Sequence, residues 1–149
     1  MTSEHRVVDT FVNVNMGSLT RPEWLTRVAE DYFKRSEHIF KDIEASALID
    51  GMDELGVDHA IITMRGHEPD SRILAFPDQY PERFSLSISV DPRRGMKSVR
   101  ELESLRRNHR VTLARIVPFM TELAPNEAPN YPIYAKCVEL DLPLSINTG

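Results

Sequence analysis

The stretch Leu144-Ser145-Ile146-Asn147-Thr148-Gly149 decides the fold, because it predicts a short buried strand that runs into a strand-to-helix turn. It is the fifth such strand in a regular alternation of strands and helices. Four earlier stretches, rich in β-branched and apolar residues, predict strands over 6–14, 60–64, 84–90 and 111–117. Helical spacing of apolar residues predicts the intervening helices, over 24–33, 48–55, 71–80, 99–105 and 131–140.

This alternation predicts an α/β chain built from parallel βαβ units with right-handed crossovers. No low-complexity linker divides the sequence, so we expect one domain over residues 1–149. A barrel of eight such units needs about 250 residues, and this sequence has 149. The pattern therefore predicts about five strands of a TIM (β/α)8 barrel, incomplete in this chain. Three explanations stay open: a fragment of a longer polypeptide, a subunit completed by an identical or complementary partner, or an open α/β domain.

The composition is that of an acidic globular chain. Its formal net charge is −5 and its sequence pI is about 5.5. Nucleic acids and anionic membranes attract a basic face, so neither is an expected partner. No apolar run approaches the ~20 residues of a membrane span, and residues 1–6 contain no apolar signal core. Cys137 is the only cysteine, which excludes an internal disulfide and indicates a reducing, cytoplasmic location.

The predicted strands have one apolar and one polar face. Strand 84–90 alternates strictly between apolar residues on one face and serines on the other. The apolar face must meet the helices, which leaves the polar face for the opposite side of the sheet. In barrels and open α/β sheets, ligands bind at the carboxyl ends of the strands. Five polar residues of that face lie at the carboxyl ends of the predicted strands: Asn13, Arg65, Asp91, Arg115 and Asn147. They are candidate ligand-binding residues, and the alternative is that they are ordinary loop-flanking residues.

Short segments in a fixed order carry a family resemblance. They are Val8-Asp9-Thr10-Phe11-Val12-Asn13, Met52-Asp53-Glu54-Leu55-Gly56-Val57-Asp58-His59-Ala60, Tyr80-Pro81-Glu82-Arg83-Phe84, Ser89-Val90-Asp91-Pro92-Arg93, Arg115-Ile116-Val117-Pro118-Phe119, Tyr131-Pro132-Ile133-Tyr134 and Leu142-Pro143-Leu144-Ser145-Ile146-Asn147-Thr148-Gly149. Together they resemble the N-terminal part of the amidohydrolase-2 family over nearly the whole chain. The resemblance implies a distorted TIM barrel and the chemistry of metal-dependent hydrolases and non-oxidative decarboxylases.

The chain departs from this family at three metal-ligand positions. The family's first strand typically ends Asp-x-His-x-His, and the positions of the two histidines are here Phe11 and Asn13. Its fifth strand usually supplies another histidine, and that position is Asn147. Phenylalanine cannot bind a metal, and a neutral asparagine oxygen is a poor zinc ligand. We therefore predict no metal ligand within this chain. A divalent metal (Zn or Mn) is expected only if its ligands come from outside residues 1–149.

The histidines and nucleophiles offer no other catalytic motif. The five histidines form no i, i+4 pair, and solvated or capping roles are expected for them: His5, His38, His59, His67 and His109. His67 is the exception to follow, because it lies with Arg65 in the turn after the second strand, where both are weak candidates for substrate binding. There is no G-x-S-x-G sequence and no glycine-rich phosphate loop. Cys137 falls in a helical pattern that predicts a buried, inert thiol.

Arg115 is the strongest single candidate for a functional residue. It occupies the last inward position before Pro118, where the family often has a lysine, and its guanidinium could hold a carboxylate by paired hydrogen bonds. The alternative is an internal ion pair with Asp91 or Asp9. The resemblance gives Asp9 a supporting role beneath the metal pair. Asn13 and Asn147 are expected to be neutral hydrogen-bonding groups beside Arg115, and Asp91 is a further weak candidate for substrate binding.

Two classes of function follow. The first is an amidohydrolase-related enzyme, a hydrolase or non-oxidative decarboxylase, acting on a small carboxylated or cyclic compound with a degenerate metal site. The second is a catalytically silent barrel fragment or subunit that binds a ligand or a complementary chain. Because a five-strand piece of a barrel exposes two strand edges, we expect a homo-oligomer or a complementary barrel segment as partner.

Overall fold

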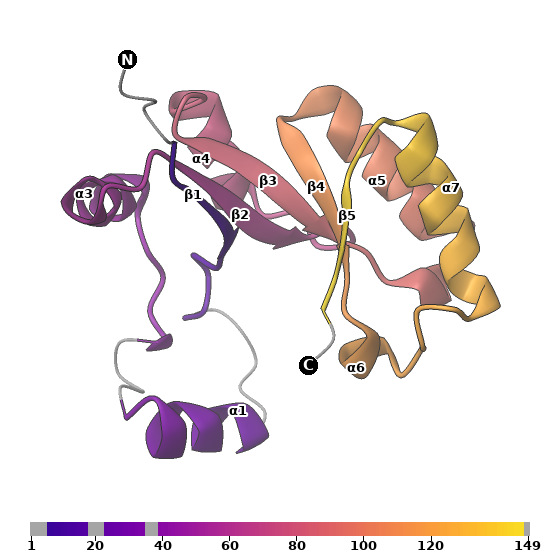
Figure 1. Ribbon diagram of the computed structural model, residues 1–149, viewed down its shortest axis with the longest axis horizontal. Coiled ribbons are helices and arrows are strands. Elements are labelled where there is room, and N and C mark those ends of the chain that lie inside the picture. The colour runs from indigo at the N-terminus through magenta and orange to yellow at the C-terminus, as the bar shows by residue number, and fades with distance from the viewer. Residues whose placement is uncertain (1–5, 18–22, 35–38, 148–149) are drawn as a thin grey trace.

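The described part of the chain forms a sheet of five parallel strands, arranged in chain order β1-β2-β3-β4-β5. The computed structural model describes residues 6–17, 23–34 and 39–147. The sheet curls into a half-barrel with its helices on the convex side (Figure 1). The predicted parallel α/β fold, with about five strands of a TIM barrel, is confirmed. The strands are β1 (Val8–Val12), β2 (His59–Arg65), β3 (Phe84–Ser89), β4 (Val111–Ile116) and β5 (Leu144–Ile146).

Helices connect successive strands, and each predicted helix has a counterpart in the structure. The helix expected over 24–33 is divided into α1 and a wider turn, η1, because the Phe33 amide donates to the Val28 carbonyl five residues back. The helical elements are α1 (Glu23–Arg27), η1 (Val28–Tyr32), α3 (Ala45–Leu55), α4 (Ser71–Gln79), η2 (Pro92–Arg94), α5 (Met96–Asn108), α6 (Pro118–Thr121), η3 (Ala128–Asn130) and α7 (Tyr131–Glu139). None of these helices is long and apolar enough to cross a membrane.

Local chemistry sets the ends of these helices. Gly56 follows α3 with φ +70°, in the left-handed region that glycine adopts without strain, and its amide donates to the Asp53 carbonyl. The Asp70 side chain caps α4 by accepting a 2.9 Å hydrogen bond from the Arg72 amide. Gly56 therefore ends α3 shortly before β2, and Asp70 begins α4 shortly after β2.

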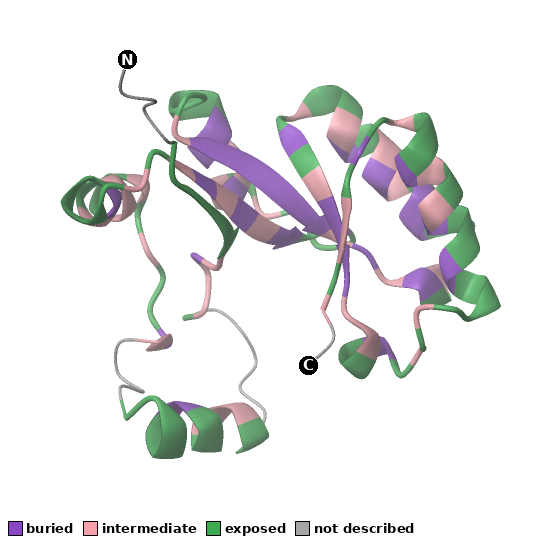
Figure 2. Ribbon diagram, viewed as in Figure 1, coloured by how far each residue is buried: buried purple, intermediate pink, exposed green. Residues whose placement is uncertain are grey.

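The hydrophobic core lies between the sheet and the helices. Ala60, Ile62 and Met64 of β2 are buried with Leu86 and Ile88 of β3, as the alternation predicts. Figure 2 shows burial concentrated in β2, β3 and β4 and on the sheet-facing sides of α5 and α7, whereas β1 is exposed. The opposite face of β3 is polar, as predicted, but it is also buried because the sheet curls around it. A polar group on this concave face is therefore shielded from water.

Strand β1 differs from the expected alternation. Asp9 pairs with Ala60 and Val12 pairs with Ile62, so the register shifts by one residue between them. Both residues therefore face the helices, and they line a hollow with Ile43 of the segment before α3. The physical cause is local, because the Asp9 carboxylate accepts a 3.0 Å hydrogen bond from the amide of Phe11, two residues on. Strict alternation along the first strand predicts Asp9 on the same face as Phe11 and Asn13. Asp9 does not share the concave face with Phe11, which corrects that placement.

Cys137 lies in α7 with 4% of its surface exposed, and burial raises the pKa of its thiol to about 11. At pH 8 only about one thiol in a thousand is then ionised, compared with about a quarter for an exposed cysteine. We expect the native protein to react with a disulfide reagent more than ~100-fold more slowly than the urea-unfolded protein. A thiol-release assay measures both rates. Similar rates in the two states would contradict the inert role predicted for this cysteine.

Candidate functional site

Arg115 extends across the concave face of the sheet from β4 to β1. Its side chain is 3% exposed. Nη1 donates to Thr63 Oγ1 on β2 at 3.4 Å, and Nη2 donates to the Thr10 carbonyl on β1 at 3.0 Å. The guanidinium carbon lies 4.0 Å from the centre of the Phe11 ring. The long side chain thus carries a positive charge to β1, three strands from its own backbone.

This buried guanidinium has no carboxylate partner among the described residues. The alternative role, an internal ion pair with Asp91 or Asp9, is not formed, because Asp91 pairs with Arg93 and Asp9 faces the helices. Nε also lacks a hydrogen-bond acceptor in the described part of the chain. Burial lowers the pKa of the Arg115 guanidinium below its ordinary value. A charge held in this way favours an anionic ligand, because desolvation of an unpaired ion is costly.

Ser87 is a second buried polar group without a partner on the same face. Its side chain is fully buried, and Oγ has no hydrogen-bond partner in the ranges that the structure covers. In the sheet register Ser87 lies between Thr63 of β2 and Leu113 of β4. We call Thr63, Ser87 and Arg115 the concave polar cluster. The alternating serines of β3 indicated this face, but the sequence could not show which hydroxyl would lack a partner.

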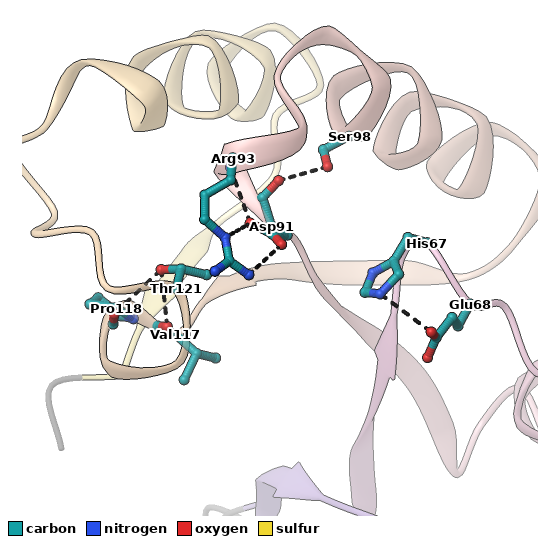
Figure 3. Close-up of polar contacts among 8 residues, drawn as sticks. All are labelled: His67, Glu68, Asp91, Arg93, Ser98, Val117, Pro118 and Thr121. Carbon is teal, nitrogen blue, oxygen red and sulfur yellow. Dashed lines mark hydrogen bonds and ion pairs between the residues drawn. The ribbon is translucent and has the colours of Figure 1, made fainter. Parts of the chain in front are cut away.

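Asp91 caps the loop after β3 and is engaged locally (Figure 3). Its two carboxylate oxygens accept 2.9 and 2.8 Å hydrogen bonds from the Arg93 guanidinium, and Oδ1 also accepts one from the Arg93 amide. Its carbonyl accepts a 2.8 Å hydrogen bond from Ser98 Oγ in α5. The hydrogen bonds from the Arg93 side chain hold the pKa of the Asp91 carboxyl below its ordinary value. Asp91 therefore orders the rim of the site.

The Asp91–Arg93 pair predicts a measurable pH effect. Because the pKa of Asp91 is lowered on folding, the pair stabilises the protein above the ordinary carboxyl pKa. The contribution is lost as the pH falls through the lowered value. Arg93→Ala is expected to raise the pKa of Asp91 toward that of a free carboxyl, measured by carbon NMR titration. Arg100→Ala serves as the control. An Asp91 pKa that is the same in both variants would contradict this assignment.

Arg65 and His67 lie at the outer end of β2, in the turn that leads to α4. Arg65 Nη1 is 3.1 Å from Glu68 Oε2. Figure 3 shows the second contact of Glu68, in which its Oε1 lies 3.6 Å from His67 Nε2. Both pairs are partly exposed to solvent and contribute little to stability. Both side chains are at the rim, as expected for the carboxyl end of a strand, and neither is hydrogen-bonded to the concave polar cluster in the described residues.

Asn13 and Asn147 follow the two edge strands of the sheet. Asn13 comes after β1 and Asn147 after β5, and both are partly buried. The Asn147 amide extends the pairing with β4 by donating to the Ile116 carbonyl at 3.1 Å. The two residues therefore lie at opposite edges of the half-barrel, with β2, β3 and β4 between them. They flank Arg115 at the carboxyl end of the sheet but are separated by the width of the sheet.

The residues present do not fit a metal centre. Within 6–17, 23–34 and 39–147, no three His, Cys, Asp or Glu side chains lie close enough to hold a metal ion. Phe11 places a ring and Arg115 a positive charge at the end of β1, and neither can bind a cation as a ligand. His59 is occupied in the sheet, because its ring nitrogens contact the Glu82 carbonyl and Ser85 Oγ. His5 and His38 lie outside the described residues.

Comparison with solved structures shows where this half-barrel occurs in other proteins. The fold matches 5-carboxyvanillate decarboxylase LigW2 of Novosphingobium aromaticivorans, bound to manganese and 3-methoxy-4-hydroxy-5-nitrobenzoic acid, at 20% identity and TM-score 0.73, over 96% of this chain and 51% of that one. It matches LigW, the 5-carboxyvanillate decarboxylase of Sphingomonas paucimobilis, at 16% identity and TM-score 0.71, over 95% of this chain and 51% of that one. It matches 2,6-dihydroxybenzoate decarboxylase of Rhizobium at 14% identity and TM-score 0.62, over 93% of this chain and 48% of that one.

These similarities establish the fold, and the chain spans about half the length of the solved structures it matches. A search of curated proteins finds no match. A protein-family model described as Amidohydrolase matches residues 6–149, which is nearly the whole sequence. The ordered segments of the sequence and the curled parallel sheet agree with this model. The chain therefore belongs to the amidohydrolase family.

Proposed function

We propose that this chain contributes to an amidohydrolase-family enzyme that acts on a small carboxylated or cyclic compound, by hydrolysis or non-oxidative decarboxylation. The observation that carries the proposal is the Arg115 guanidinium, which is buried at the ligand-binding side of the sheet without a carboxylate partner in the described residues. The decarboxylases with the same fold support this class of reaction, since one of them is bound to an aromatic carboxylate analogue.

Each candidate residue has a distinct role in this proposal. Arg115 holds the substrate carboxylate, with Nε as an unused donor and with Thr10 and Thr63 fixing the direction of the guanidinium. The uncharged side chains of Asn13 and Asn147 donate or accept hydrogen bonds at the two edges of the carboxyl end of the sheet. Three residues at the rim contact the substrate weakly: Arg65, His67 and Asp91. Asp9 supports β1 through its hydrogen bond with the Phe11 amide.

In this proposal the remaining strands of the barrel come from further residues of a longer polypeptide, from a complementary segment, or from a second copy of this chain. Both edge strands support this part of the proposal, because Val8 of β1 and Ile146 of β5 expose 45% and 38% of their surface. An exposed parallel edge offers unpaired backbone groups to a further strand. Any divalent metal of the complete site takes its ligands from outside residues 1–149. The single domain over 1–149 and the cytoplasmic location remain part of the proposal.

The second candidate is a catalytically silent barrel half that binds a ligand or a complementary chain. The donor set at β1 favours it, because Phe11 and Asn13 stand at two positions where the family resemblance places metal-binding histidines. Both candidate functions predict that the protein binds a carboxylate ligand, but only the enzyme is expected to turn it over. They are therefore separable by one pair of measurements on the same purified protein.

The test compares binding and turnover of carboxylates with those of matched neutral amides. Calorimetry with benzoate and benzamide is expected to show binding of the acid and little binding of the amide. Carbon dioxide release from hydroxybenzoates, or amide hydrolysis, then identifies the enzyme. Carboxylate binding without turnover on either class of substrate would favour the silent barrel half. Equal binding of benzoate and benzamide would contradict the carboxylate-binding role of Arg115 and the proposed function with it.

A further inference from the structure

The guanidinium of Arg115 lies at β1, against the Thr10 carbonyl and the Phe11 ring. The family resemblance implies a metal ligand at the position of Phe11. Its backbone belongs to β4, where Arg115 pairs with Ser89 of β3. The side chain then contacts Thr63 on β2 and the Thr10 carbonyl on β1. It ends under the ring of Phe11, which stands where the family resemblance places a metal-binding histidine. One long side chain thus carries a fixed positive charge to the metal-ligand end of β1.

The surroundings of the guanidinium do not neutralise this charge. Asp9, the acidic residue next to Thr10, faces the helices and accepts a hydrogen bond from the Phe11 amide. Asp91, at the end of β3, is held by Arg93. The groups that do surround the guanidinium are the Thr10 backbone carbonyl, the Thr63 hydroxyl and the aromatic face of Phe11. This set stabilises a cation weakly and leaves it free to attract an anion.

The same set of groups opposes a divalent cation. A second positive charge near a buried guanidinium is repelled strongly, because little water screens the two charges. Phe11 offers no lone pair, and Asn13 offers one neutral oxygen. Two groups of this face have no hydrogen-bond partner among the described residues, Arg115 Nε and Ser87 Oγ, and both can donate hydrogen bonds to an anion. The chemistry of this face is therefore that of an anion site.

We propose that Arg115 supplies the positive charge of this site in place of a divalent metal, so that carboxylate binding by this protein is independent of metal. The inference rests on the proposed function and adds to it the source of the charge. Phe11 has a matching role as the cover of the guanidinium. It is 49% exposed, and its ring centre lies 4.0 Å from the guanidinium carbon, so the ring covers one face of the charge.

The experiment measures benzoate binding to the purified protein by calorimetry, once in EDTA and once in excess manganese chloride. We expect dissociation constants that agree within about twofold, because the charge that holds the carboxylate is covalently part of the chain. Electron paramagnetic resonance of Mn2+ gives an independent readout. The signal of free Mn2+ is expected to remain undiminished when the protein is added at equal concentration, in the wild type and in Asn13→Ala alike.

Two outcomes would overturn the inference. The first is one Mn2+ bound per chain and lost in Asn13→Ala, and the second is benzoate binding that appears only with manganese. The proposed function survives either of them, since the carboxylate still binds. Absence of benzoate binding in both buffers would contradict the proposed function itself. Arg115→Lys keeps the charge in a compact ammonium and is expected to bind benzoate in EDTA about tenfold more weakly. A Lys variant that requires manganese would also overturn the inference.

Discussion

Replacing Arg115 by methionine is expected to weaken carboxylate binding by about 100-fold or more while leaving the free energy of unfolding nearly unchanged. Hydrogen bonds to charged groups contribute about 1.5–3 kcal/mol each, and about 1.4 kcal/mol corresponds to a factor of ten in affinity. Loss of two such bonds from the guanidinium to a carboxylate therefore removes at least a factor of 100. Calorimetric titration with benzoate measures the change.

The stability of this variant follows from two opposing effects. Methionine leaves the Thr10 carbonyl and the Thr63 hydroxyl without the donors they have now, which costs about 1–3 kcal/mol for each group that stays dry. It also removes a buried cation that has no carboxylate partner in the described residues, and replacement of buried ions by apolar side chains is often neutral or stabilising by about 1–4 kcal/mol. The two effects offset each other, so urea unfolding is expected to show a small change.

The matched control is Arg100→Met, which makes the same substitution at an exposed position of α5. Benzoate affinity and stability are expected to stay at their wild-type values in this control. If Arg115→Met bound benzoate as tightly as Arg100→Met, the guanidinium would have no role in carboxylate binding. A large loss of stability in Arg115→Met alone would show that the residue serves mainly to hold β4 against β1.

Replacing Phe84 by alanine is expected to lower the free energy of unfolding by about 3–5 kcal/mol. The Phe84 ring is fully buried at the start of β3, with its centre 5.3 Å from that of Phe76 and 6.2 Å from that of Tyr80. Both neighbours belong to α4 or its end, so the ring joins this helix to the sheet. Because whole domains are stable by only about 5–15 kcal/mol, this one cavity removes a large part of the stability.

Urea denaturation followed by circular dichroism measures the effect. Val138→Ala is the control, since Val138 lies on the outer side of α7 and exposes 83% of its surface. A change within about 0.5 kcal/mol is expected there. A loss below about 1 kcal/mol in Phe84→Ala would mean that α4 and β3 collapse around the cavity, and that the aromatic cluster is not a main source of stability.

The strands, the helices and the helix-facing residues of the sheet were predictable from the sequence because they depend on short-range patterns. Leu86 and Ile88 alternate with serines, and this period of two places them on one face of any strand. Gly56 marked the end of α3 because few other residues adopt its positive φ. Alternation also assigns the polar strand residues to one face, and the helical connections between parallel strands bring the carboxyl ends of the strands to one edge of the sheet.

The placement of Asp9 was wrong for a physical reason that also lies close in sequence. The Asp9 carboxylate captures the amide of Phe11 and shifts the register of β1, so the simple alternation fails there. A side-chain hydrogen bond of this kind competes with strand pairing, and its outcome depends on how the partner strand is positioned. Only the pairing with β2 shows on which face the carboxylate finally lies.

The sequence by itself determined that this chain forms parallel βαβ units with polar strand ends. The family resemblance implies in addition that Phe11 and Asn13 stand where a metal-binding family has histidines. Only the tertiary structure decided that Arg115 crosses the concave face to β1, that no described carboxylate pairs with it, and that Ser87 is buried beside it without a partner. The physical reason is the separation along the sequence of the residues that interact. Periodicity and capping act over a few residues, whereas the partners of a buried charge come from strands more than 50 residues apart in the chain.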